Sequence, residues 1–216
     1  MHPDRRLDSA VLAPEGRRIP CLDRYPKSLP GEILLRPMTA EDESGLVRFF
    51  KRIPVEERQF FREDVTEAAV IQGWIRNLDY RRVLPLLAFQ GSRVVADATL
   101  HRDTGGWSRH LGKIRLTLDP DVRRQGLSRL LIQEFLELST PLRVAVLEAE
   151  ILDVQAEAAS LFEDMGFQCV ATLPQHAIDL CGRVHDLRLY AQMTRLPEGL
   201  APEARVAEAD ADVGGG

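Results

Sequence analysis

Hydrophobic residues along the chain follow two spacings, which together predict a mixed α/β domain. Strands, where apolar positions alternate or run together, are expected over residues 33–36, 83–89, 93–102, 113–118, 142–149, 167–172 and 184–193. Helices, where apolar positions recur every three or four residues, are expected over 39–53, after Pro54, and over 66–78, 125–138 and 153–165. This order of elements predicts one mixed sheet with helices on both faces.

The two ends of the chain lack both spacings. Residues 1–31 contain five prolines, and we expect an extended or loosely packed N-terminal arm. Residues 197–216 are small and acidic and end in three glycines, so they bury too little apolar surface to offset their ordering entropy. We therefore expect a disordered acidic tail over 197–216 and a single domain over 32–196.

The junction between the predicted strand 113–118 and the predicted helix 125–138 carries the most chemical information. After Asp119-Pro120 come Arg123, Arg124 and Gln125, and then Gly126 opens the helix. The first N–H groups of a helix have no intrahelical acceptor, and with the helix dipole they bind phosphate well. Gly126 has no Cβ, which lets a ligand approach the backbone. The junction predicts an anion site, although an ordinary surface turn has the same short pattern.

Composition narrows the class of ligand and the compartment. Hydrophobic residues make up 44% of the chain, enough for a packed core, and the net charge of −5 provides no general basic field for nucleic acid. The three cysteines have no C-x-x-C spacing, so we expect neither a metal site nor a disulfide framework. No apolar run approaches the roughly 18 residues of a membrane span, and no signal-peptide segment is recognisable. We expect a cytoplasmic protein without membrane or nucleic-acid partners.

Two motifs resemble the GNAT family of acyl-CoA-dependent N-acetyltransferases, and the likeness extends over roughly residues 32–196. The first is LDPDVRRQGLS at 118–128, where the family has x-Pro and then Arg/Gln-x-x-Gly-x-Gly/Ala before a helix. The second is Gln155, Ala158, Phe162 and Gly166-Phe167, where the family has Asn-x-x-Ala, an aromatic residue and Gly-Phe. The segments 34–50 and 182–196 are similar to the family's first strand and helix and to its last strand. The resemblance implies the GNAT fold, a mostly antiparallel sheet with one splayed parallel pair.

The resemblance also implies a site for acetyl-CoA. The amide groups of 124–129 would hold the pyrophosphate, the arginines would add charge-assisted contacts, and the backbone of 116–118 would pair with the pantetheine arm. Ser128 replaces a family Gly or Ala, and Gln155 replaces an Asn while keeping its amide. The cofactor-binding residues implied are Leu116, Thr117, Leu118, Arg123, Arg124, Gln125, Gly126, Leu127, Ser128, Arg129, Gln155 and Phe162.

The family's usual acid and base are both replaced in this sequence. Phe162 stands where many members have a tyrosine that protonates the leaving thiolate, and Lys113 stands where many have a glutamate base. The candidates to replace them are His110, Asp103, Glu148, Glu150 and Tyr190. The structural alternatives are a solvent-exposed loop histidine for His110, a pair of solvated carboxylates near a strand end for Glu148 and Glu150, and a half-buried strand aromatic for Tyr190.

The activity implied by the resemblance is N-acetylation: an acetyl or other acyl group moves from coenzyme A to a primary amine of a small molecule or protein. The first helices would shape the pocket for this acceptor. The alternative is an acyl-CoA-binding or sensing module that kept the coenzyme site and lost the acid and base. A P-loop nucleotide hydrolase is excluded, because no Gly-Lys-Ser/Thr follows the turn. The acceptor and the oligomeric state, including a homodimer, stay open.

Overall fold

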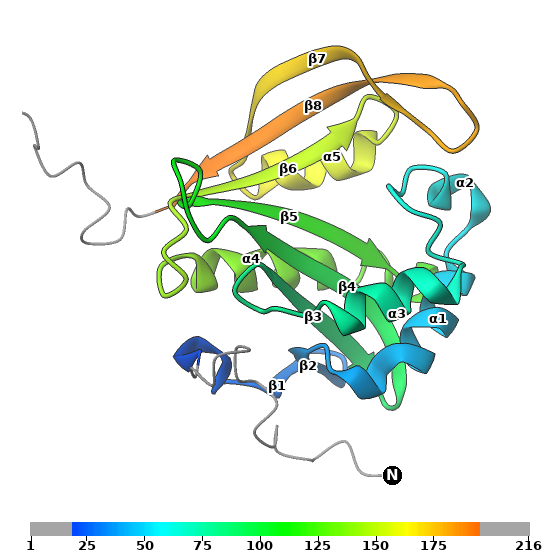
Figure 1. Ribbon diagram of the computed structural model, residues 1–216, viewed down its shortest axis with the longest axis vertical. Helices are drawn as coiled ribbons and strands as arrows, with labels where there is room; N and C mark the ends of the chain where they lie inside the picture. The colour runs from blue at the N-terminus through cyan, green and yellow to red at the C-terminus, as the bar shows by residue number, and fades with distance from the viewer. Residues whose placement is uncertain (1–18, 195–216) are drawn as a thin grey trace, which may run out of the picture.

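The central feature of the fold is an eight-stranded mixed sheet, which the computed structural model places within the described residues 19–194 (Figure 1). Its strands lie in the spatial order β1 (Lys27–Leu29), β2 (Ile33–Pro37), β3 (Val83–Gln90), β4 (Arg93–Arg102), β5 (Leu111–Leu118), β6 (Val146–Leu152), β8 (Val184–Met193) and β7 (Gln168–Ile178). In this sheet β5 and β6 are parallel, and the other neighbouring pairs are antiparallel. The predicted mixed sheet is confirmed.

Helices cover both faces of this sheet (Figure 1). One face carries α1 (Glu43–Arg52), α2 (Val55–Arg58) and α3 (Ala68–Arg76), and the other carries α4 (Leu127–Ser139) and α5 (Ala156–Asp164). Short 3-10 turns precede β1, α1 and α4, at Pro20–Leu22, Ala40–Asp42 and Pro120–Val122. No helix among residues 19–194 is long and apolar enough to cross a membrane.

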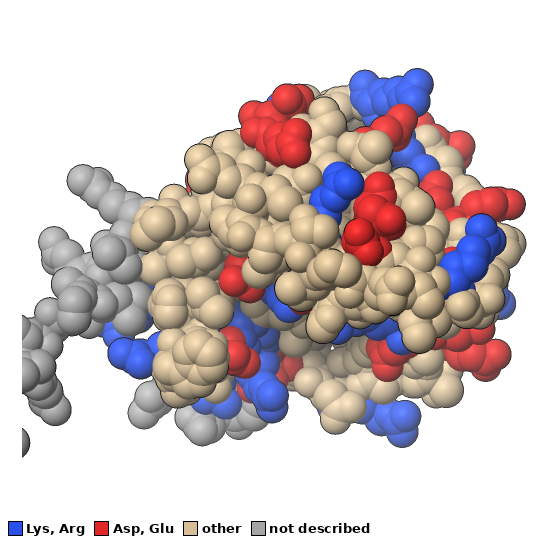
Figure 2. All heavy atoms as spheres, turned by 90° about the horizontal axis from the view of Figure 1, so that it is seen from above, with Lys and Arg blue, Asp and Glu red and all other residues tan. Residues whose placement is uncertain are grey.

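The hydrophobic core is divided by the sheet into two clusters. Along β3, Leu86 and Ala88 pack into the cluster under α4, whereas Leu87 and Phe89 pack into the cluster under α1 and α3. Successive strand residues point to opposite faces, so a strand covered on both sides needs apolar residues at every position. This explains the nearly continuous apolar run in β3. On the surface, charges of both signs are interspersed (Figure 2).

Several elements differ from the sequence-based expectations: β7 runs on to Ile178 instead of ending at residue 172, and β5 begins at Leu111 instead of residue 113. The expected strand over 142–149 starts at Val146, because the chain first turns through Arg143, whose φ is +57°. The expected arm is not loose over residues 19–31: β1 joins the sheet, Leu22 and Tyr25 are buried, and the Tyr25 hydroxyl donates to Glu134. The rest of the arm, residues 1–18, and the tail over 197–216 lie outside the described residues.

The parallel pair β5–β6 is splayed. The two strands pair at three positions only, Leu111↔Val146, Gly112↔Leu147 and Lys113↔Glu148. On its other side β5 stays paired with β4 as far as Leu118. Within the part of the chain that the structure describes, no strand pairs with the β6-facing edge of β5 beyond Lys113. The splay expected from the resemblance is confirmed, and it leaves an open strand edge in the middle of the sheet.

Close packing fixes the end of the β5–β6 pair at which the two strands are still paired. A Cβ atom on Gly112 would lie 2.9 Å from a methyl group of Leu100 and 2.9 Å from one of Val144. These distances are shorter than side chains tolerate, so only glycine allows the strands to approach as they do here.

Candidate coenzyme and acceptor site

The splay opens into a cleft of about 1930 Å³ that passes through the sheet. Its walls come from β5, the turn before α4 and the start of α5, and from the α2–α3 segment and the β7–β8 hairpin across the opposite face. The hairpin also touches the α2–α3 segment: the Leu180 N–H donates to the Gln59 carbonyl at 2.9 Å, and the rings of Phe60 and His185 meet edge to face at 5.7 Å. The cleft is therefore bridged on that side.

One half of the cleft ends at the turn before α4. Among residues 19–194 no acceptor is found for the backbone N–H groups of residues 124 to 129, and the first N–H of this helix to bond inside it is that of Leu130. Gly126 is the N-cap residue with φ +83°, and no heavy atom lies within 4 Å of the place where its Cβ would stand. The turn thus presents a row of free amide donors to open space, which suits a phosphate group.

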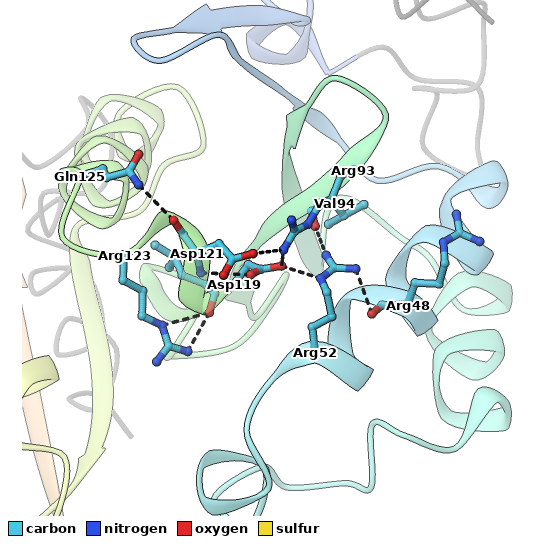
Figure 3. Close-up of polar contacts among 9 residues, drawn as sticks. Arg48, Arg52, Arg93, Val94, Asp119, Asp121, Arg123 and Gln125 are labelled. Atoms are coloured by element: carbon cyan, nitrogen blue, oxygen red, sulfur yellow. Dashed lines mark hydrogen bonds and ion pairs between the residues drawn. The ribbon is translucent and has the colours of Figure 1, made fainter.

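A buried carboxylate holds this turn in shape (Figure 3). Asp119 is 1% exposed, and its Oδ2 accepts from Arg52 Nε at 2.6 Å and from Arg93 Nη2 at 2.7 Å. Its Oδ1 accepts from the Asp121 N–H at 3.2 Å. Burial opposes ionisation of Asp119, but the bonds from the two arginines outweigh it and hold its pKa below the usual range. The turn is therefore anchored to α1 and β4.

The arginines of the turn are already paired within the protein. Arg123 donates to both oxygens of Glu57, at 2.6 and 2.8 Å, and to the Leu118 carbonyl at 2.9 Å. Arg124 and Arg129 are exposed and pair with the acidic residues Glu157 and Asp164 of α5. The backbone amides, rather than these side chains, are the free donors in this region.

The other predicted coenzyme residues divide between the cleft and its surroundings. The side chains that line it, besides Arg123 and Arg124, are those of Leu116, Thr117, Leu118, Ser128, Gln155 and Phe162. Gln125 turns away and donates to the Asp121 carbonyl, and Leu127 is buried in the core. Gln155 caps the loop before α5 by accepting from the Leu152 N–H at 2.9 Å. Phe162 is 5% exposed and packs edge to face on Phe167.

Of the five catalytic candidates, only Glu150 is among the residues that line the cleft. Tyr190 is buried, and its hydroxyl donates to Glu163 of α5 at 3.0 Å. The His110 carbonyl accepts from the backbone of 145 and 146 at the joined end of the splay, and Asp103 accepts from the hydroxyl of Ser108 in an exposed turn. Glu148 lies beside Lys113 in the register of the parallel pair.

Glu150 is held as an ion at the floor of the cleft. It accepts hydrogen bonds from Lys113 on β5 and from Arg62 in the α2–α3 segment. Burial raises the pKa of Glu150, but the bond from Lys113 and the charges of Lys113 and Arg62 outweigh this and lower it. A carboxylate stabilised in this way is a weak base, and Lys113 serves as its ion-pair partner.

The floor of the cleft also contains residues that the sequence interpretation missed. Asp97, Thr99 and His101 of β4 and Arg115 of β5 all line the cleft, and the register places Thr99 beside Arg115. Burial raises the pKa of Asp97 to about 7. Burial, together with the neighbouring cations, lowers the pKa of His101 to about 4, so this imidazole is neutral at pH 7. The available signal was the polar alternation within an otherwise apolar strand.

The sequence matches the acetyltransferase (GNAT) family over residues 48–167, more than half of its 216 residues. A comparison with curated proteins finds no match. Solved structures similar to this fold include the acetyltransferase of the GNAT family from Streptococcus pneumoniae, 20% identical with a TM-score of 0.64, covering 75% of this chain and 99% of that one.

Two further structures are similar. One is yncA from Salmonella typhimurium, solved with its cofactor acetyl-CoA, 19% identical with a TM-score of 0.65 over 80% of this chain and 98% of that one. The other is the ribosomal-protein-alanine N-acetyltransferase from Brucella melitensis, 24% identical with a TM-score of 0.64 over 74% of this chain and 99% of that one. At these identities the likeness shows the fold, and the family match adds the classification. The chain belongs to the GNAT acetyltransferase family.

Proposed function

We propose that this protein is an acetyl-CoA-dependent N-acetyltransferase that acetylates a primary amine. The observation that carries the proposal is the meeting of two unpaired sets of backbone groups in one cleft. These are the free amides of residues 124 to 129, of which Arg124 and Ser128 line the cleft, and the β6-facing edge of β5 beyond Lys113. A diphosphate joined to an amide-containing arm is complementary to both sets.

The residues present fit coenzyme A. The open space at Gly126 and the small side chain of Ser128 leave room for phosphate oxygens beside the amides. The backbone between Leu116 and Leu118 would pair with the amide groups of the pantetheine arm, and Phe162 would pack beside it. Bound there, acetyl-CoA supplies the acetyl group as a reactive thioester. The solved complex of yncA with acetyl-CoA supports this choice of cofactor.

Asp97 is the residue we propose as proton acceptor for the amine. An amine must lose a proton to become an amide, and a base works best when its pKa lies near the working pH. Asp97 has a pKa raised to about 7 and lines the cleft, and among residues 19–194 no donor bonds its carboxyl group. Glu150 is a poorer base because Lys113 and Arg62 stabilise its charge. Phe162 offers no hydroxyl, so the thiol leaves without help from this position.

The test combines coenzyme binding with turnover. Calorimetry should show saturable binding of coenzyme A, and a thiol-release assay with acetyl-CoA should show turnover on at least one member of a panel of amino acids, polyamines and peptides with free N-termini. The peptides are included because a similar structure is described as a ribosomal-protein-alanine N-acetyltransferase. Tight coenzyme binding without turnover on any acceptor would instead favour the sensing module.

A further inference from the structure

The acceptor half of the cleft contains a cation that forms neither a hydrogen bond nor a close ion pair within the described residues, although Glu150 and Glu63 lie near enough to influence its charge. Arg115 lies on β5 between Lys113 and Thr117, and all three side chains line the cleft. Within the described range 19–194, Arg115 has no hydrogen bond, and no carboxylate lies within ion-pair distance of it. Lys113 and Arg62, by contrast, share the carboxylate of Glu150. Arg115 is thus free to bind a ligand.

The local balance of charge favours an anionic ligand. Three cationic side chains, Arg62, Lys113 and Arg115, lie near two carboxylates, Glu150 and Glu63, and of these pairs only those of Arg62 and Lys113 with Glu150 are close ion pairs. Partial desolvation and the charge of Arg62 lower the pKa of Arg115, and the carboxylates of Glu150 and Glu63 act in the opposite direction. The side chain of Arg115 is exposed and keeps its proton, so a ligand carboxylate can reach it and form charge-assisted hydrogen bonds.

The proposed base lies at a suitable distance from this cation. Thr99 pairs with Arg115 and Asp97 pairs with Thr117 in the β4–β5 register, so Asp97 and Arg115 are diagonal neighbours on one face. Diagonal neighbours on antiparallel strands have Cα atoms about 7–8 Å apart. One small molecule can therefore reach both, with its carboxylate at Arg115 and its amine at Asp97. An α-amino acid carries these two groups on a single carbon.

The wall opposite this floor is apolar and aromatic. The ring of Phe50 meets those of Phe61 and Trp74 edge to face, with centroids 5.9 and 5.7 Å apart. All three residues come from the α1–α3 side and line the cleft, together with Met38, Phe60, Val65 and Leu78. Glu63 also lines this wall and accepts from the indole N–H of Trp74 at 2.8 Å, and the aromatic surface around it can bind an apolar or aromatic group.

We propose that the acceptor is a free amino acid with an apolar or aromatic side chain. Its carboxylate binds Arg115, its amine faces Asp97, and its side chain packs on the wall formed by Phe50, Phe61 and Trp74. This inference rests on the proposed N-acetyltransferase function and adds the class of its substrate. A peptide N-terminus lacks the adjacent carboxylate and would leave Arg115 unpaired.

The first experiment compares acceptors that differ only in the carboxylate. Thiol release is measured at saturating acetyl-CoA with L-phenylalanine against phenethylamine, L-leucine against 3-methylbutylamine, and L-phenylalanine against the dipeptide phenylalanyl-alanine. A charge-assisted pair contributes about 10- to 100-fold, so kcat/KM should favour at least one amino acid by that factor. The variant R115Q should erase the preference by lowering kcat/KM for the amino acid toward that for the matching amine. R109Q, at an exposed loop arginine outside the cleft, is the matched control.

A second measurement does not depend on turnover. Calorimetry in the presence of coenzyme A compares N-acetyl-L-phenylalanine and N-acetyl-L-leucine with the corresponding acetylated amines; the carboxylates should bind at least about 10-fold more tightly, and R115Q should remove the difference. Amine acetylation without a carboxylate preference, or a preference for the dipeptide, overturns the inference and leaves the proposed function standing. Carboxylate binding through Arg115 without turnover supports the anion site and contradicts the transferase. Equal binding of both compounds contradicts the anion site.

Discussion

The two halves of the cleft differ in the chemical groups that form them, which are backbone groups in one half and side chains in the other. The coenzyme half is made of backbone: free amides at residues 124 to 129 and an unpaired edge of β5, all within one short stretch of chain. The acceptor half is made of side chains from β4, β5, β6 and the α2–α3 segment, which are far apart in the sequence. A local backbone site can be recognised from a motif, whereas a site assembled from distant side chains depends on strand register. If the halves also work separately, a substitution in one half should leave the function of the other unchanged.

Asp97→Asn should have the largest effect and should damage the acceptor half alone. If Asp97 accepts the proton from the amine, its loss should lower kcat about 10²- to 10⁴-fold. Coenzyme affinity, measured by calorimetry, should stay unchanged. Asp103→Asn, in an exposed turn outside the cleft, provides the control. Loss of coenzyme binding in Asp97→Asn would show that the halves are not separate.

The pH dependence of turnover and of stability provides a second test of the role of Asp97. Since burial raises its pKa to about 7, kcat/KM should rise as pH increases through 7, and this rise should be absent in Asp97→Asn. The contribution of Asp97 to the free energy of unfolding changes in the opposite direction, because it decreases as pH rises. A carboxyl group whose folded pKa is raised stabilises the fold below its unfolded pKa, near 4, and loses that contribution as pH rises through 7. Asp97→Asn should therefore melt at a higher temperature than the parent at pH 8, and a lower one would contradict the assignment.

Gly126→Val should damage the coenzyme half alone. The side chain would occupy the open space beside the free amides, and we expect coenzyme affinity to fall about 100-fold, or about 2.7 kcal/mol. The φ of +83° adds backbone strain, so the variant also loses stability. Gly106→Val is a matched control, because that glycine has φ +72° and equally open surroundings but lies in the turn between β4 and β5, outside the row of free amides. Equal affinities for the two variants would contradict the placement of the pyrophosphate.

The sequence predicted the two halves to different extents. Gly126 and its turn could be recognised because the motif is contiguous, but the pairing of Arg123 with Glu57 could not, because it joins residues 66 positions apart. Periodicity placed Tyr190 on a strand without deciding its face, and the register with Ala149 directs it to α5. Asp97 follows the ordinary alternation of a half-buried strand. Asp97 lines the floor of a cleft only because β5 and β6 are splayed, and the sequence pattern of β4 does not reveal this.

Gly112→Val should affect both halves, because Gly112 lies at the joint between them, the end where β5 and β6 are paired. The added side chain would meet Leu100 and Val144 at the end where β5 and β6 are paired, and overpacking of this kind costs about 1–3 kcal/mol. Chemical denaturation should show this loss. Gly105→Val, in the exposed turn between β4 and β5, controls for the loss of a glycine in open surroundings, because Gly105, like Gly112, has no positive φ. Equal stability of the two variants would mean that the joint relaxes and does not set the splay.

Phe162→Tyr should have the smallest effect, at the border between the halves. A tyrosine hydroxyl can protonate a leaving thiolate, and if it faces the cleft, kcat should rise a few-fold with no change in coenzyme affinity. Burying a new hydroxyl costs about 1–2 kcal/mol when it finds no partner. Phe167→Tyr is the matched control, because its ring packs on Phe162 but does not line the cleft. If both variants lose stability and neither gains rate, protonation of the leaving thiolate from this position does not limit turnover.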